Sequence, residues 1–450
     1  IRGCNFNATT GMLTKIPKQG VFPQNHIRLD NVTAFTLGLG SSAGTNLLNE
    51  FSDVYMGIFA NESSLEVFAS AFDNLINYSV SPPQKGIGIN AHNSTSNPQI
   101  LEVDCRFRNL HRGIFTRGNF DINIHNCDHF RDIDGEAISI NSMNFANTIN
   151  IIDNTQFQRC NIGIRVSGGK LNSLNISNNE LDNAGFVETS SGAFHNTGIT
   201  VQKWSSTPTN TGVVEIFNNT ISDFRNGIHA INIKNVRIGG YDGNNNPRPN
   251  ILNYNLSNSV LSETYHGIWV QNCDDADILA NDIENDDPTQ ETNLRGIVVE
   301  NSDNANIGCN TIGQMGRAMQ FEGLCMGVPG TQLLKNVMTN YEIGIELNLA
   351  QIPPQGVSGN PWDNEWVNTN LTKNKINGML WSPTQLIDWY FQGTDGDDTD
   401  PLVPSPRGPG LIDPTGGQAP GSSICANANR IAGFDRDYSW GPVAIDTASY

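Results

Sequence analysis

Residues 295–307 read Arg-Gly-Ile-Val-Val-Glu-Asn-Ser-Asp-Asn-Ala-Asn-Ile, and this stretch decides the fold. Gly296-Ile297 begins a short run in which apolar residues recur at every second position, as in a half-buried strand. Ile307 begins a second pattern, an apolar residue followed three positions later by Asn310. The stretch therefore predicts short strands joined by polar turns.

Both halves of this pattern recur along the chain, mostly at intervals of about 25 residues, which is a repeat length typical of solenoids. The first half is found at Gly57-Ile58, Gly86-Ile87, Gly113-Ile114, Gly163-Ile164, Gly198-Ile199, Gly227-Ile228, Gly267-Ile268, Gly296-Ile297 and Gly344-Ile345. The second half places Asn154, Asn179, Asn219, Asn281, Asn310, Asn336 and Asn374. A coil of two or three short strands cannot bury its own apolar face, so the coils are expected to stack.

Stacking explains why the chain contains about 60 asparagines. Equivalent positions in coils about 4.8 Å apart lie above one another, so the recurring asparagines are predicted to form a structural ladder of side-chain amides. Asparagine also tolerates the left-handed backbone conformation of a tight corner. The glycine before each isoleucine is expected to provide either a positive φ or a close approach of two backbones.

In the earlier copies Ser70, Cys105 and Cys127 take the place of the ladder asparagine. Stacked cysteines lie within the Cα separation of a disulfide, so Cys105 and Cys127 could form a bridge or remain buried thiols. The eight cysteines show no Cys-x-x-Cys or Cys/His metal spacing, so a zinc site is not expected.

The repeat resembles the right-handed parallel β-helix repeat family, over roughly residues 50–378, and its clearest copy is 295–307. The resemblance implies an all-β chain, a right-handed parallel β-helix (solenoid) with a C-terminal cap and tail. We expect the β-helix over 1–378, with irregular first coils in 1–56, and a Pro/Gly/Trp-containing cap and tail over 379–450. Such a cap and tail resembles secreted surface proteins of gliding-type bacteria.

The net charge of the chain limits the kinds of partner that it can bind. The net charge is −19, with 26 basic and 45 acidic residues, so a nucleic acid would be repelled. No run approaches the ~20 apolar residues of a membrane-spanning helix, so no membrane span is expected. The opening Gly3-Cys4-Asn5-Phe6 reads like Gly308-Cys309-Asn310-Thr311, which predicts that the chain begins inside a coil, as a segment of a larger protein or after removal of a leader.

One segment has the composition of a catalytic site. Asp132, Asp134 and Glu136 alternate along a strand, and two carboxylates are what glycoside hydrolysis requires, one as acid and one as base. The run resembles the Gly-Asp-Asp-x-Ile-Ser-Ile segment of polygalacturonase-like β-helix glycosidases, which would make Asp134 and Glu136 the acid pair. His266 is a further candidate acid or base. The alternative is that the segment is a solvated turn and His266 a surface residue.

Two other groups of residues could bind ligands. Asp395, Asp397, Asp398 and Asp400 offer the oxygen ligands that calcium prefers, and calcium is the one cofactor that the sequence allows. The alternative is a solubilising acidic loop in a protein without a cofactor. Trp204 and Trp269 could stack on sugars or serve only in packing.

These observations favour a secreted structural or adhesive β-helix surface module, found outside the cell or on its surface. Its expected partners are a glycan or a cell-surface component, and further copies of the chain stacked end to end into an extracellular filament. We expect no enzyme activity. The alternative is a polysaccharide-active enzyme, a glycosidase or lyase, that acts in a groove along one sheet.

Overall fold

The structure, a computed structural model, describes residues 5–7, 25–38, 49–52, 54–77, 84–142, 148–169, 173–186, 196–205, 209–255, 264–286, 292–367, 376–380, 386–392, 401, 404, 411–416 and 418. The chain divides into two compact units, residues 1–204 and 205–450. Nearly all the regular structure is parallel β-strand, and each unit is a parallel β-helix, which confirms the predicted fold class. The units are described in turn.

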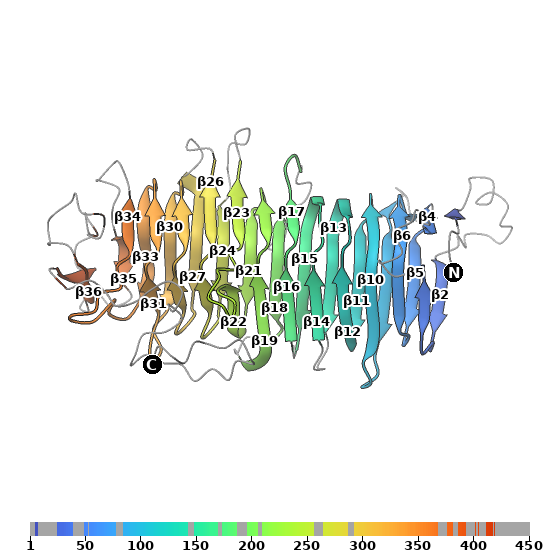
Figure 1. Cartoon of the computed structure of the whole chain (residues 1–450), viewed down its shortest axis with the longest axis horizontal. Helices are drawn as coiled ribbons and strands as arrows, with labels where there is room; N and C mark the ends of the chain where they lie inside the picture. The colour runs from blue at the N-terminus through green and yellow to red at the C-terminus, as the bar shows by residue number, and fades with distance from the viewer. Residues whose placement is uncertain are drawn as a thin grey trace. The chain divides into compact units, whose positions relative to one another are not determined.

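Each coil of the first unit contributes to three parallel sheets (Figure 1). Sheet 1 contains β2 (Asn25–Asp30), β5 (Met56–Asn61), β9 (Ile87–Asn93), β11 (Arg112–Gly118), the second halves of β13 (His129–Ser142) and β15 (Phe157–Gly168), and β18 (Thr197–Lys203). Sheet 2 contains β3 (Phe35–Leu37), the first halves of β6 (Leu65–Asp73) and β10 (Gln99–Arg108), β12 (Phe120–His125), β14 (Thr148–Ile152) and β16 (Ser173–Ser177). Sheet 3 contains β1 (Asn5–Asn7), β4 (Asn49–Ser52), the second halves of β6 and β10, the first halves of β13 and β15, and β17 (Glu180–Asp182).

Two details complete the first unit. β7 (Ile76–Asn77) and β8 (Gln84–Lys85) form a short antiparallel pair. β1 pairs with β4 so that Asn5 lies beside Glu50 rather than beside Asn49. Since Asn49 is the ladder residue of its coil, the predicted equivalence of Asn5 and Asn310 is wrong by one position.

The second unit repeats the three-sheet coil with shorter strands. Sheet 1 contains β21 (Asn226–Ile231), β24 (Tyr265–Gln271), β27 (Leu294–Glu300), β30 (Arg317–Leu324), β33 (Ile343–Gln351) and β35 (Ile376–Leu380). Sheet 2 contains β19 (Thr209–Phe217), β22 (Ile233–Gly239), β25 (Asp277–Leu279), β28 (Asn306–Gly308) and β31 (Gln332–Leu334). Sheet 3 contains β20 (Thr220–Ser222), β23 (Ile251–Tyr254), β26 (Asp282–Asn285), β29 (Thr311–Gly313), β32 (Val337–Thr339) and β34 (Glu365–Val367).

A tryptophan-containing region follows the last coil of the second unit. β36 (Ile387–Tyr390) pairs in parallel with β37 (Ile412–Thr415). Trp389 is buried and packs against the buried Trp366, with ring centroids 6.1 Å apart. The segment after the last coil thus adds a large aromatic side chain to the buried core of the second unit.

The Gly-Ile pattern reflects a close approach between coils. A Cβ placed on Gly57 would lie 2.7 Å from the carbonyl oxygen of Gly88, and a Cβ on Gly88 would lie 2.6 Å from that of Gly113. None of these three glycines has a positive φ, so steric contact with the next coil, not backbone conformation, explains them. Ile58 pairs with Ile89, so the copy predicted at Gly86-Ile87 belongs at Gly88-Ile89, two residues later.

Amide ladders run through the coil corners between sheets 2 and 3. Asn154 Nδ2 donates to Asn179 Oδ1 in the first unit (3.0 Å). In the second unit each Nδ2 donates to the next Oδ1 at 2.9–3.0 Å, through Asn219, Asn250, Asn281, Asn310, Asn336 and Asn364. Asn250 and Asn364 were not expected, and the predicted Asn374 lies outside the described residues.

The left-handed residue of this corner is not the ladder asparagine but the residue before it. Asp153 has φ 56°, Asn178 56° and Asn218 54°, and Ala280 and Lys335 have 56° and 48°. The side-chain amide of the ladder asparagine forms hydrogen bonds with backbone N–H and C=O groups around this turn. Each buried amide thereby satisfies donors and acceptors that would otherwise destabilise the core by about 1–3 kcal/mol apiece.

Cys105 and Cys127 continue the corner as thiols, not as a disulfide. Both are free and buried. The Cys105 backbone N–H donates to Cys127 Sγ at 3.4 Å, and the Cys127 N–H donates to Asn154 Oδ1 at 3.0 Å. Each sulfur thus replaces the asparagine oxygen as an acceptor, so the predicted bridge is wrong and the alternative of stacked thiols is correct.

Candidate functional site

Asp132, the first of the three candidate acids, is bound by arginines. Its Oδ1 accepts a hydrogen bond from Arg159 Nε at 2.6 Å, and its Oδ2 lies 3.4 Å from Arg131 Nε. The hydrogen bond from Arg159 is the main reason that the pKa of Asp132 is lowered from its ordinary value. A general acid of a glycosidase needs a raised pKa, so Asp132 has the opposite property.

Asp134 and Glu136 also have cationic partners. Asp134 Oδ1 lies 3.4 Å from Lys85 Nζ. Glu136 is buried; its Oε2 accepts from Arg112 Nε at 2.5 Å, and its Oε1 lies 3.6 Å from Arg165 Nη1. Asp134 and Glu136 are therefore paired with different cations.

His266 and Trp269 lie together in β24 of the second unit. His266 Nδ1 makes a 2.7 Å hydrogen bond with Asn226 Oδ1. Burial, and after it the neighbouring His229, lowers the pKa of His266 to about 3, so the ring is neutral at physiological pH. The one N–H of a neutral imidazole is far too weak an acid to serve in general acid catalysis near neutral pH.

Trp269 stacks on His229, with ring centroids 4.1 Å apart and planes 4° apart. The register places Trp269 between His229 and Val298 of the adjacent coils. One face of the indole is therefore covered by imidazole and the other is directed at the next coil, whereas a sugar needs an open face on which to stack. Trp204, at the end of the first unit, is 50% exposed and keeps open surface.

The calcium prediction cannot be examined at Asp395, Asp397, Asp398 and Asp400, because these residues lie outside the described part of the chain. Within that part, no group of three or more His, Cys, Asp or Glu side chains is arranged to hold a metal ion.

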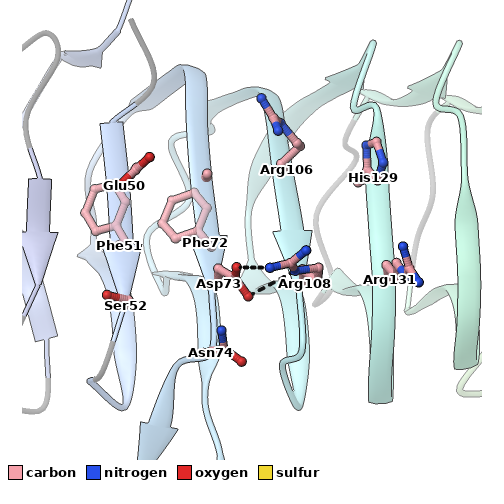
Figure 2. A pocket seen from close by; sticks show the side chains of 11 residues that line it. Glu50, Phe51, Ser52, Phe72, Asp73, Asn74, Arg106, Arg108, His129 and Arg131 are labelled. Carbon is pink, nitrogen blue, oxygen red and sulfur yellow. Dashed lines mark hydrogen bonds and ion pairs between the residues drawn. The ribbon is translucent and has the colours of Figure 1, made fainter. Parts of the chain in front are cut away.

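A pocket of about 400 Å³ lies on sheet 3 of the first unit, where four strands run side by side (Figure 2). Phe51 and Phe72 are among the residues of these strands that point into the core and are buried. The residues that alternate with them along each strand face outward. The lining consists of Glu50, Phe51, Ser52, Ala71, Phe72, Asp73, Asn74, Arg106, Arg108, His129 and Arg131.

The register explains both the hollow and its chemistry. One outward row runs Glu50, Ala71, Arg106, His129, and a second runs Ser52, Asp73, Arg108, Arg131. The small side chains of Ala71 and Ser52 leave space beside the long arginine side chains in each row. Three guanidinium groups and an imidazole gather in this lining, and each arginine also contacts an aspartate, Asp128, Asp73 or Asp132.

Two arginines of the pocket, Arg108 and Arg106, differ in how tightly a carboxylate binds them. Arg108 forms a two-pronged contact with Asp73, through Nε at 3.3 Å and Nη2 at 2.6 Å. Arg106 Nε lies 3.5 Å from Asp128, and both side chains are about half exposed. Sequence reasoning missed this pocket, because its rows join residues 21 to 35 positions apart across coils of unequal length.

Comparisons with protein-family models, with curated proteins and with solved structures found no match. The described part of the chain contains no helix of the length and apolarity needed to cross a membrane.

Proposed function

We propose that this chain is a secreted, non-catalytic β-helix module with a structural or adhesive role at the cell surface. The observation that carries the proposal is the pairing of Asp132, Asp134 and Glu136 with separate cations. These ion pairs join residues of different coils, so the three carboxylates contribute to holding the stacked coils together.

The cysteines support an extracellular location. Cys309 is disulfide-bonded, and disulfides persist mainly in secreted and surface proteins. The resemblance to the right-handed parallel β-helix repeat family, which includes adhesins and structural proteins, points the same way. The fold alone does not select among the functions of that family.

A degradation assay tests the non-catalytic part. The whole protein and its Glu136→Gln variant are incubated with panels of acidic and neutral polysaccharides, and new reducing ends and unsaturated products are measured. We expect no products from either protein. Products that require Glu136 would overturn the proposal in favour of a polysaccharide-active enzyme, the alternative predicted from the sequence.

Adhesion and assembly are tested separately. We expect the protein to bind immobilised glycans or cell surfaces, and copies to associate end to end, because the strands of a terminal coil present unpaired edges. Binding is measured on glycan-coated surfaces and assembly by electron microscopy. A protein that remains dispersed and binds none of these surfaces would contradict the adhesive and filament-forming roles.

A further inference from the structure

We propose that the pocket on sheet 3 of the first unit binds an acidic oligosaccharide through an oxyanion, either a carboxylate or a sulfate ester. This proposal rests on the proposed adhesive function and gives it a ligand. A volume of about 400 Å³ lies at the lower end of the range for small-ligand sites, about 300–1,000 Å³, and accommodates one or two sugar units.

Asp73 shows how this surface binds a carboxylate. Its two oxygens accept from Nε and Nη2 of Arg108, the fork geometry that arginine offers to planar oxyanions. This contact also fixes Arg108 at the centre of the pocket (Figure 2). An oxyanion of a ligand would meet the neighbouring arginines with the same geometry.

Arg106 and Arg131 are the groups that would receive this oxyanion. They lie on the adjacent strands β10 and β13 but not opposite each other, since Arg106 pairs with His129 and Arg131 with Arg108. The two guanidinium groups therefore stand diagonally across the pocket, and an anionic group bound between them would contact both. The contact of Arg106 with Asp128 is a long surface pair, which contributes little and is easily exchanged.

Arg131 and His129 each have a buried ring or guanidinium nitrogen that contacts an aspartate without a hydrogen bond, His129 Nδ1 lying 3.5 Å from Asp128 Oδ1. Arg131 Nε is buried and lies 3.4 Å from Asp132 Oδ2, yet it makes no hydrogen bond within the described residues. The Oδ1 of Asp132 is already bound by Arg159. His129 Nδ1 is likewise buried without a hydrogen bond in the described part of the chain. Satisfying such groups on binding a ligand is favourable.

The pocket also selects against other ligands. No aromatic face is available in its outward rows, since the phenylalanines of these strands are buried in the core. Recognition by stacking, the usual mode for neutral sugars, is therefore absent from these rows, and charge provides the specificity.

Calorimetric titration of the whole protein tests the proposal. The probes are a trimer of galacturonic acid, a sulfated galactose oligomer, and a neutral galactose trimer as the matched uncharged control. We expect one or both acidic probes to bind, with an affinity that falls as salt is added, and the neutral probe not to bind. The stronger acidic probe identifies the source of the oxyanion. Equal binding of the neutral trimer, or binding of none of the three, would overturn the assignment.

Variants locate the binding site. The double variant Arg106→Gln/Arg131→Gln should weaken binding of the acidic probe by about a hundredfold, since the loss of each charged hydrogen bond alone weakens it by about tenfold or more. Arg117→Gln, an exposed arginine on β11 outside the pocket, is the matched control and should bind like the unaltered protein. Ala71→Leu fills the hollow without changing charge and should also weaken binding. Unchanged binding by the double variant and Ala71→Leu would overturn the assignment.

The same samples separate the two proposals. Cleavage of the oligosaccharide during the titration would contradict the non-catalytic function but leave a binding loss in Arg106→Gln/Arg131→Gln as support for the pocket. An oligosaccharide that stays intact and does not bind would contradict the proposed ligand of the pocket, but it would not affect the proposed structural role of the protein.

Discussion

The corner ladder is built differently in the two units. In the second unit every described step from Asn219 to Asn364 is an amide. Each of the first five donates to the next, and those from Asn250 onward also donate to a backbone carbonyl of an adjacent coil. In the first unit the steps are Asn49, Ser70, Cys105, Cys127, Asn154 and Asn179. The corner therefore requires an acceptor for the backbone N–H, which a hydroxyl, thiol or amide can supply.

The row of core side chains in sheet 3 also differs between the two units, and here the first unit has the larger side chains. Sheet 3 of the first unit stacks phenylalanines, with centroids 4.6–5.1 Å apart, at Phe51, Phe72, Phe107, Phe130 and Phe157. The corresponding row of the second unit contains Ile221, Leu252, Ile283, Ile312, Met338 and Trp366. Aromatic stacking accompanies the weaker ladder, and the amide ladder accompanies a mostly aliphatic row. We infer that the two units depend on different interactions for the same stacking.

Loss of a stacked aromatic ring should have the largest effect. Phe107 is fully buried between Phe72 and Phe130, so Phe107→Ala leaves a cavity and should lower the free energy of unfolding by about 4 kcal/mol. Ile283→Val, in the same row of the second unit, should lower it by about 1 kcal/mol. Urea denaturation followed by circular dichroism measures both. Equal losses would show that the stack adds nothing to ordinary burial.

Removing one amide from the ladder should be nearly as damaging. Asn310 accepts from the backbone N–H and Nδ2 of Asn281 and donates to Asn336 Oδ1, so Asn310→Ala should cost about 3 kcal/mol. Ser70→Ala, at the same place in the first unit, removes a weaker set of contacts and should cost about 1 kcal/mol. Hydrogen exchange at the corner amides reports the loss locally. A smaller effect at Asn310 than at Ser70 would contradict the comparison of the ladders.

The fold could be predicted from sequence because stacking repeats a local pattern. Asn281 and Asn310 follow an apolar residue by three positions, so the pattern finds them. Asn250 and Asn364 occupy the same corner but follow Pro247 and Pro361 at that distance. The backbone there is fixed by the neighbouring coils, and the local sequence does not reveal it.

The candidate site could not be predicted in the same way. Lys85 reaches Asp134 and Arg112 reaches Glu136 only because insertions of unequal length bring their coils into register. The alternating acids were visible in the sequence, but the cations that neutralise them were not. Electrostatic partners in a solenoid lie one or two coils away, at separations that no fixed period provides.

Alkaline pH should distinguish a buried thiol from its hydroxyl replacement at Cys273, in the turn between β24 and β25. Burial raises the pKa of Cys273 to about 12, and its backbone N–H donates to Ser302 Oγ at 2.8 Å. Below about pH 9 the thiol is protonated in both the folded and unfolded states, so its contribution to stability is complete. Between about pH 9 and 12 the unfolded state ionises first, and this contribution falls by about 1.4 kcal/mol per pH unit.

The Cys273→Ser variant lacks this titration and serves as the control. Urea denaturation at pH 8 and pH 10 should show a steeper loss of stability for the unaltered protein than for Cys273→Ser. The remaining buried thiols are common to both proteins, so their titration cancels in the difference. Parallel losses would show that Cys273 is not protected in the folded state.

Converting a thiol step into an amide step gives the finest test of the comparison between the ladders. In Cys127→Asn the new Oδ1 can accept from the Cys105 N–H, and Nδ2 can donate to Asn154 Oδ1, as in the second unit. The side chains are similar in size, and the site already contains the acceptor that Nδ2 requires.

We expect a gain of about 1 kcal/mol in the free energy of unfolding, since one hydrogen bond is added and a sulfur acceptor is replaced by oxygen. Cys127→Ala, which has no acceptor, should instead destabilise the protein. A loss of stability in Cys127→Asn of the same size as in Cys127→Ala would mean that the first unit is shaped for sulfur at this corner, and that the two ladders are not interchangeable.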